Sequence, residues 1–229
     1  SSTDLAAAGY IVVVVDAPSD QGQGMSDPFR TSPQHAKDVR KIIAYLKEKH
    51  RMASLYLVGT SRGTISAAYL ASVLDEPSIE GVILTAVYPP AELGGIDFSE
   101  IDYPVLIVHH VYDECRVTPF QGAVDMKERL TESSGVDLVG VTGGMPPVSG
   151  PCNALSRHGF YGAEQPVIRV IKDWTDQTIR ELDHKYLNEI SIFHGSNPSS
   201  ENIAHYIYTQ IARKVSMPGL RITRVTVWE

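Results

Sequence analysis

The chain has 229 residues, 43% of them hydrophobic and 21% charged, and its formal net charge is -7. This is the composition of an ordinary globular protein, and the length allows one large domain or two small ones. The acidic balance argues against a nucleic-acid-binding protein, and no apolar run is long enough to span a membrane. We therefore expect a small-molecule partner and neither a nucleic acid nor a membrane.

The first residues read as the end of a helix that leads into a strand. Residues 1–4 include no initiator Met and no signal-like segment, and they run directly into the apolar residues 5–10. We expect further sequence upstream of this start, which could have included a targeting segment.

Residues 10–15 form a continuous run of tyrosine, isoleucine and four valines. Such a run predicts a central parallel strand that is buried on both faces. After a loop rich in turn formers, Ser32 and Pro33 begin a predicted helix over 33–49. Its apolar residues recur at helical spacing: Val39, Ile42, Ile43 and Leu46.

The pattern G-x-S-x-G follows a short apolar run at 54–58 and precedes a predicted helix over 62–74. Between a buried strand and a helix, this pattern is typical of a strained turn that exposes a serine hydroxyl, here that of Ser61. We expect both Gly59 and Gly63 to be required, because strand and helix backbones approach too closely for a β-carbon. The alternative is a glycine-rich turn with a solvated serine.

Strands and helices continue to alternate up to Trp174. We predict strands over 79–87, 103–110 and 136–141, and helices over about 117–130 and 163–174. This alternation predicts the α/β class with a parallel, doubly wound sheet.

Functional sites of such sheets collect at the carboxyl ends of the strands. Three reactive side chains follow predicted strand ends: Ser61, Asp113 and His158. Asp113 could instead cap its loop, and His158 could be a solvated loop residue. The two cysteines, Cys115 and Cys152, allow either a disulfide or two buried thiols.

Residues 9 to about 174 resemble the α/β-hydrolases, in which Ser, Asp and His follow one another in this order. The resemblance is to a branch with these motifs: D-E-C-R-V-T-P at 113–119, G-M-P-P at 144–147, P-C at 151–152 and H-G-F-Y-G at 158–162.

The resemblance implies that Ser61 is the nucleophile, that His158 is the general base and that Asp113 is the carboxylate that orients His158. It also implies that the backbone N–H of Arg62 is an oxyanion donor, and that this part needs no metal or cofactor. The second oxyanion donor and the first strands would lie upstream of residue 1. Without that donor we expect a rate loss of about 10²–10³.

The same resemblance implies a disulfide between Cys115 and Cys152, which would fix the loops that carry the acid and the histidine. Such a bond suits an oxidising compartment, the periplasm or secretion. We expect the hydrolase domain, truncated at its amino terminus, to span 1–174.

Residues 173–229 resemble the C-terminal half of the 6-pyruvoyl and 6-carboxytetrahydropterin synthases, a partial α+β tunnel fold (T-fold), and we place this second domain at 175–229. The likeness is carried by L-D-H-x-x-L-N at 182–188 and N-P-S-S-E-N at 197–202. It implies a proton relay with Asp183 and His184, a pterin-binding Glu229, a homo-oligomer and a cytoplasmic location. The alternative is a plain extension of the hydrolase with Asp183 and His184 on its surface.

The zinc-binding histidines and catalytic cysteine of that family belong to its N-terminal half, and residues 1–172 carry none of their motifs. Zinc would therefore bind only if other chains supplied that half. The histidines before residue 172 are spread over hydrolase elements: His35, His50, His109, His110 and His158.

These patterns favour a serine hydrolase of small ester-like substrates that carries a partial pterin synthase tail. A second hypothesis is a zinc-dependent pterin synthase of queuosine or biopterin biosynthesis. A third is an inactive fusion of two partial domains.

Overall fold

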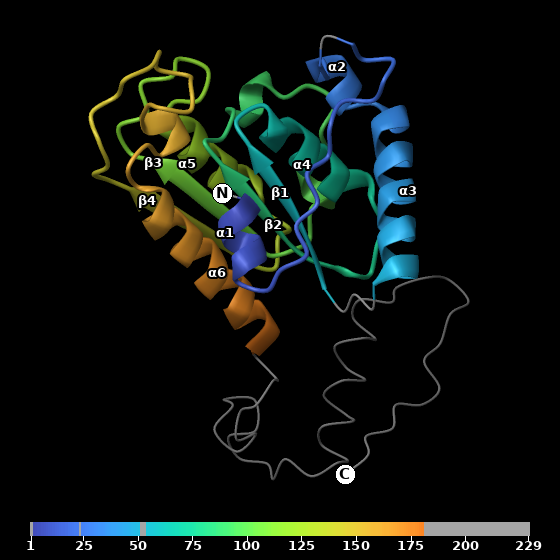
Figure 1. Cartoon of the computed structure of the whole chain (residues 1–229). Coiled ribbons are helices and arrows are strands. Elements are labelled where there is room, and N and C mark those ends of the chain that lie inside the picture. The colour runs from blue at the N-terminus through green and yellow to red at the C-terminus, as the bar shows by residue number, and fades with distance from the viewer. Residues whose placement is uncertain (1, 23, 51–53, 181–229) are drawn as a thin grey trace, which may run out of the picture. The chain divides into compact units, whose positions relative to one another are not determined.

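The computed structural model describes residues 2–22, 24–50 and 54–180 (Figure 1). The chain divides into two compact units, residues 1–174 and 175–229. The tunnel-fold segment predicted for the second unit lies beyond Arg180, outside the described residues.

Four parallel strands form one sheet in the order of the chain: β1 (Leu55–Thr60), β2 (Ile79–Thr85), β3 (Val105–His110) and β4 (Val136–Val141). Every neighbouring pair is parallel, and Leu57, Val82, Val105 and Val136 lie opposite one another across the sheet. The predicted parallel sheet and the α/β class are confirmed.

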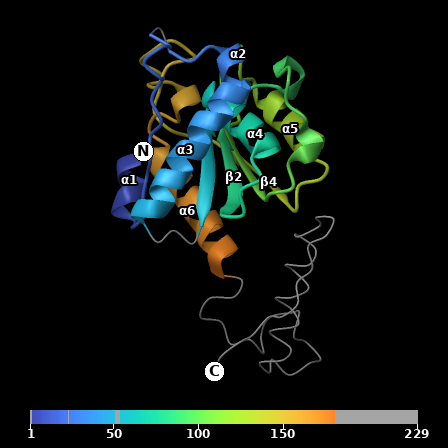
Figure 2. The same cartoon turned by 90° about the vertical axis from the view of Figure 1, so that its right-hand side faces the viewer.

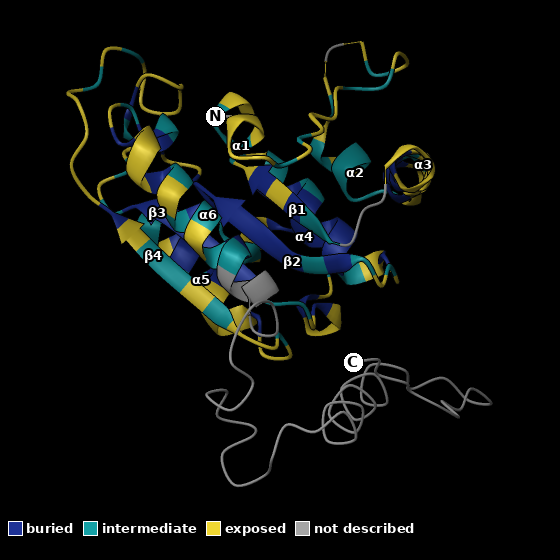
Figure 3. Cartoon of the chain, turned by 60° about the horizontal axis from the view of Figure 1, so that its bottom comes forward, coloured by how far each residue is buried: buried dark blue, intermediate teal, exposed yellow. Residues whose placement is uncertain are grey.

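Helices cover both faces of this sheet. One face packs against α3 (Pro33–Lys49), α4 (Gly63–Val73) and α5 (Phe120–Arg129), and the other against α1 (Ser2–Ala7) and α6 (Glu164–Arg180). Figure 2 shows α1 on one side of the sheet and α4 and α5 on the other. The central strands are therefore buried, with all six residues of β3 excluded from solvent (Figure 3). None of the described helices is both long and apolar enough to cross a membrane.

Local signals placed most elements correctly. The helix predicted over 33–49 is α3, whose first turn is capped by the Ser32 hydroxyl, an acceptor for the His35 N–H at 3.2 Å. The predicted strand 136–141 is β4. Four short elements were not predicted: α2 (Asp27–Arg30) and the 3₁₀ turns η1 (Pro90–Glu92), η2 (Phe98–Glu100) and η3 (Arg157–Gly159).

The strand predicted over 10–15 is wrong. These residues have no regular structure, and the side chains of Ile11 and Val14 are 58% and 75% exposed. Within the described ranges, no backbone hydrogen bond joins residues 11–15 to a strand, and β1 forms the edge of the sheet. A strand requires a neighbour to pair with, so high β-propensity alone does not produce one.

Candidate functional site

Ser61 occupies the turn between β1 and α4. Its φ of 52° is uncommon for a residue other than glycine. Two hydrogen bonds hold this conformation: the Ser61 N–H donates to the Thr85 carbonyl at 2.9 Å, and the Thr64 hydroxyl donates to the Ser61 carbonyl at 2.6 Å. The serine therefore stands at the carboxyl end of the sheet in a strained turn.

The two glycines of this turn play different parts. A β-carbon on Gly59 would lie 2.5 Å from the backbone oxygen of Gly63, so the expected close approach is confirmed at Gly59. A β-carbon on Gly63 would meet no described atom within 4 Å, so the expectation for Gly63 is wrong. The contact is one-sided because the missing β-carbon of Gly59 points at the helix, whereas that of Gly63 points into open space.

His158 lies in η3, beyond the long loop that follows β4. Its Nε2 is 2.9 Å from the hydroxyl oxygen of Ser61, and its Nδ1 is 2.9 Å from Oδ2 of Asp113. The structure thus brings the three predicted side chains into one hydrogen-bonded row. His158 is only 6% exposed, which excludes the alternative of a solvated loop histidine.

Asp113 follows β3, and its side chain is completely buried. Its Oδ1 accepts a hydrogen bond from the Cys115 N–H at 2.9 Å, so the carboxylate does cap its own loop, while Oδ2 faces His158. Burial by itself raises the pKa of Asp113. Hydrogen bonds from His109, His158 and the Cys115 N–H outweigh burial and hold this pKa well below its usual range. Asp113 is therefore ionised at neutral pH.

Two side chains beside Asp113 received no role from the sequence. The hydroxyl of Thr118 donates to Asp113 Oδ2 at 3.1 Å and lies 2.9 Å from Nδ1 of His158. Nε2 of His109 lies 3.4 Å from the same Oδ2. Thr118 could have been selected from the motif at 113–119, which contains it, and His109 from its position at the carboxyl end of β3, where sites collect.

Cys115 and Cys152 form a disulfide. It joins the loop that contains Asp113 to the loop between β4 and η3 that leads to His158. The alternative of two buried thiols does not hold, since Cys152 is exposed as well as bonded.

Arg62 follows the serine. Within the described ranges its backbone N–H makes no hydrogen bond, so it remains available to a bound group. Its side chain is held at the surface by Asp27, with Nε and Nη2 at 3.0 and 2.8 Å from the two carboxylate oxygens.

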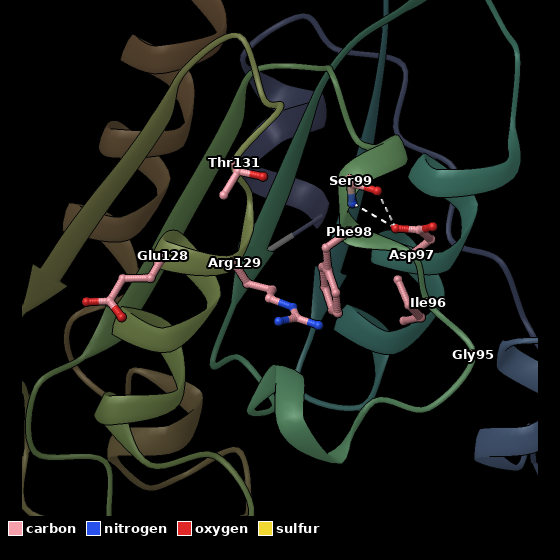
Figure 4. Close-up of a pocket in the computed structure, with 8 residues that line it drawn as sticks. All are labelled: Gly95, Ile96, Asp97, Phe98, Ser99, Glu128, Arg129 and Thr131. Atoms are coloured by element: carbon pink, nitrogen blue, oxygen red, sulfur yellow. Dashed lines mark hydrogen bonds between the residues drawn. The ribbon is translucent and has the colours of Figure 1, made fainter.

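One cavity among the described residues, of about 640 Å³, is lined by the segment 95–99 and the end of α5. Figure 4 shows Arg129 beside Phe98, and Ser99 donates a hydrogen bond to Asp97. Because α5 runs back from the carboxyl end of β3, this cavity lies toward the amino ends of the strands, away from Ser61. The second, of about 390 Å³, is bordered by Ile65 of α4 and by Tyr88.

The residues suggested for the pterin-like tail, Asp183, His184 and Glu229, lie outside the described residues. Across the described ranges, no three histidine, cysteine or acidic side chains are grouped as a metal ion would require. The ring nitrogens of His109, His110 and His158 have protein partners in these ranges. The described residues therefore do not fit a zinc site.

Comparison with known proteins finds one family model and several solved structures that are similar to this chain. Residues 168–229 match the family model of 6-pyruvoyl tetrahydropterin synthase. A similar solved structure is MGS-MChE2, an α/β hydrolase enzyme from the metagenome of sediments of the lagoon of Mar Chica, Morocco. It has 14% sequence identity and a TM-score of 0.45, over 62% of this chain and 70% of that chain. Among curated proteins, none matches this chain.

The first unit is thus an α/β protein with a Ser–His–Asp row at the carboxyl ends of its strands. The last part of the chain, residues 168–229, is similar to the 6-pyruvoyl tetrahydropterin synthase family, which confirms the resemblance of the tail.

Proposed function

We propose that the chain is a serine hydrolase that acts on small ester-like substrates. The observation that carries this proposal is the row from Ser61 Oγ through His158 to Asp113, in which both hydrogen-bonding distances are 2.9 Å. A buried imidazole between a hydroxyl and a carboxylate is the arrangement that activates a serine as a nucleophile.

The carboxylate decides the tautomer of His158. Ionised Asp113 can only accept hydrogen bonds, so the proton of the neutral ring resides on Nδ1. Nε2 then carries a lone pair and accepts the hydrogen bond from the Ser61 hydroxyl. As Ser61 attacks the acyl carbon, His158 takes its proton and later gives that proton to the leaving alcohol. His158 then takes a proton from a water molecule, which attacks the acyl group and releases it from Ser61, and the proton returns to the Ser61 oxygen.

The negative oxygen of the tetrahedral intermediate needs donors near Ser61. The N–H of Arg62, which has no partner among the described residues, supplies one, and the amino end of α4, which begins at Gly63, favours negative charge at the same place. A cavity of about 390 Å³ is bordered by Ile65, which follows Ser61 by four residues in the chain, and its volume lies within the range of small-molecule sites.

The test is hydrolysis of p-nitrophenyl acetate and butyrate by the full chain. Ser61→Ala should abolish activity above background, whereas Ser149→Ala, in an exposed loop, should leave it unchanged. A fluorophosphonate probe should modify Ser61 in the wild type, as read by peptide mass spectrometry. Hydrolysis that survives Ser61→Ala would refute the proposal.

A second candidate follows from the match of residues 168–229, namely a pterin synthase. The described residues offer no zinc site, so this function would require another chain to supply one. Zinc content of the purified protein and conversion of dihydroneopterin triphosphate test it. Failure of both assays, together with no ester hydrolysis, would leave the inactive fusion.

A further inference from the structure

Three polar groups converge on a single oxygen, Oδ2 of Asp113. They are Nδ1 of His158 at 2.9 Å, the hydroxyl of Thr118 at 3.1 Å and Nε2 of His109 at 3.4 Å. The side chains of Asp113 and His109 are wholly excluded from solvent, and Thr118 is also 0% exposed. No bulk water reaches this oxygen, so its protein neighbours alone determine where the carboxylate sits.

The ring of His109 can face Asp113 only as a donor. The Val87 N–H donates to Nδ1 of His109 at 3.0 Å, which leaves no room for a proton on that nitrogen. The ring hydrogen therefore lies on Nε2, between the Thr118 carbonyl at 3.0 Å and Asp113 Oδ2 at 3.4 Å. Ala86, whose φ is 49°, follows the end of β2 and immediately precedes this N–H.

The Thr118 hydroxyl closes a triangle with the other two groups. Nδ1 of His158 carries a hydrogen, so the Thr118 oxygen accepts at 2.9 Å and its own hydrogen is free for Asp113 at 3.1 Å. Thr118 thus touches both the ring and the carboxylate. Its carbonyl is held in turn by His109, so the two residues support each other.

We propose that His109 and Thr118 are positioning residues that clamp Asp113 Oδ2 and the ring of His158 in the geometry that activates Ser61. This role rests on the proposed serine-hydrolase function. Their contacts are with Asp113 and with Nδ1 of His158, on the side of the ring away from the Nε2 that faces Ser61. Their effect is on orientation, and small misplacements of a catalytic group lower rates by about 10²-fold.

The matched variants are Thr118→Val and Thr118→Ser. Valine keeps the shape and removes the hydroxyl, whereas serine keeps the hydroxyl. We expect Thr118→Val to lower kcat for the p-nitrophenyl ester by about 10- to 100-fold with KM nearly unchanged. Thr118→Ser should restore most of the rate. The labelling rate of Ser61 by the fluorophosphonate should follow kcat in each variant.

The outcomes separate the two proposals. A wild type whose Ser61 is not labelled refutes the hydrolase function itself. A labelled wild type with Thr118→Val as fast as Thr118→Ser refutes the clamp alone. If Thr118→Val fails to fold, ¹⁵N NMR of the imidazole nitrogens in the wild type tests the clamp instead. The neutral Nε2–H tautomer of His109 supports the clamp, and a hydrogen on its Nδ1 overturns it.

Discussion

His158 Nε2 lies 2.9 Å from Ser61 Oγ although 97 residues separate them. Ser61 follows β1 and His158 follows β4, which lie at opposite edges of the four-stranded sheet. Three strand spacings amount to about 14 Å, so the loop after Val141 must return across the strand ends. Figure 1 shows this loop at the upper end of the sheet, and the disulfide between Cys152 and Cys115 ties it to the loop that follows β3.

Replacement of Asp113 by asparagine should lower kcat by about 10³–10⁴, the loss known when a serine–histidine pair loses its carboxylate. Both oxygens of Asp113 accept hydrogen bonds, so the asparagine amide meets a donor in either orientation. When the amide faces His158, it favours the wrong tautomer. The measurement is kcat for p-nitrophenyl butyrate. Asp125→Asn on α5 is the control, and equal activity of the two variants would contradict the assigned role.

Asp113 should also make folding sensitive to acid. Its pKa in the folded protein is lowered well below the unfolded value of about 4. As the pH falls, the unfolded state therefore binds a proton at a higher pH than the folded state does. The stabilisation is complete above about pH 5 and is lost as the pH falls toward the folded pKa. Urea unfolding at pH 6 and pH 3 should show a larger loss for the wild type than for Asp113→Asn. Carboxylates elsewhere contribute equally to both proteins, and equal losses would refute the expectation.

Gly59→Ala and Gly63→Ala should differ sharply in stability. The new β-carbon at Gly59 would lie 2.5 Å from the oxygen of Gly63, a backbone atom that cannot move without disrupting the turn. We expect the free energy of unfolding of this variant to fall by about 3 kcal/mol or more, or the variant to be insoluble. At Gly63, where nothing lies within 4 Å, alanine should cost nothing and could add about 0.4–1 kcal/mol. Urea unfolding of both variants provides the comparison.

Reduction of the disulfide should cost stability and activity together. The bridge closes a loop with a sequence separation of 37 residues, for which chain entropy gives about 4 kcal/mol. Reductant should lower the midpoint of urea unfolding in the wild type and slow ester hydrolysis, because the loop that carries His158 loses its anchor. Cys152→Ser, which places a small polar group at an exposed position, should have the stability and activity of the reduced wild type. Added reductant should change neither. A reductant effect that persists in this variant would contradict the explanation.

Local sequence signals predicted individual elements well. The helix over 33–49 combines a serine cap, a proline at its first turn and an apolar stripe, all of which act within a few residues. Ser61, Asp113 and His158 could be selected because each follows a strand, and parallel strands all end at one side of the sheet.

Features that depend on partners distant in the sequence were mispredicted or missed. The run at 10–15 has the composition of a strand, but pairing is a property of two segments, and these residues have no strand partner among the described ones. Thr118 lies within the motif at 113–119 and His109 lies in no motif, and neither was given a role from the sequence. Their contacts with Asp113 arise from the path of the loop between β3 and α5.

The sequence by itself determined the alternation of strands and helices and the chemical groups available at the ends of the strands, because these follow from local propensity and periodicity. Only the tertiary structure decided that the imidazole of His158 meets Ser61 and that Asp113 is buried and ionised among four donors. A returning loop and a dry environment are cooperative properties of the packed chain, so no single segment encodes them.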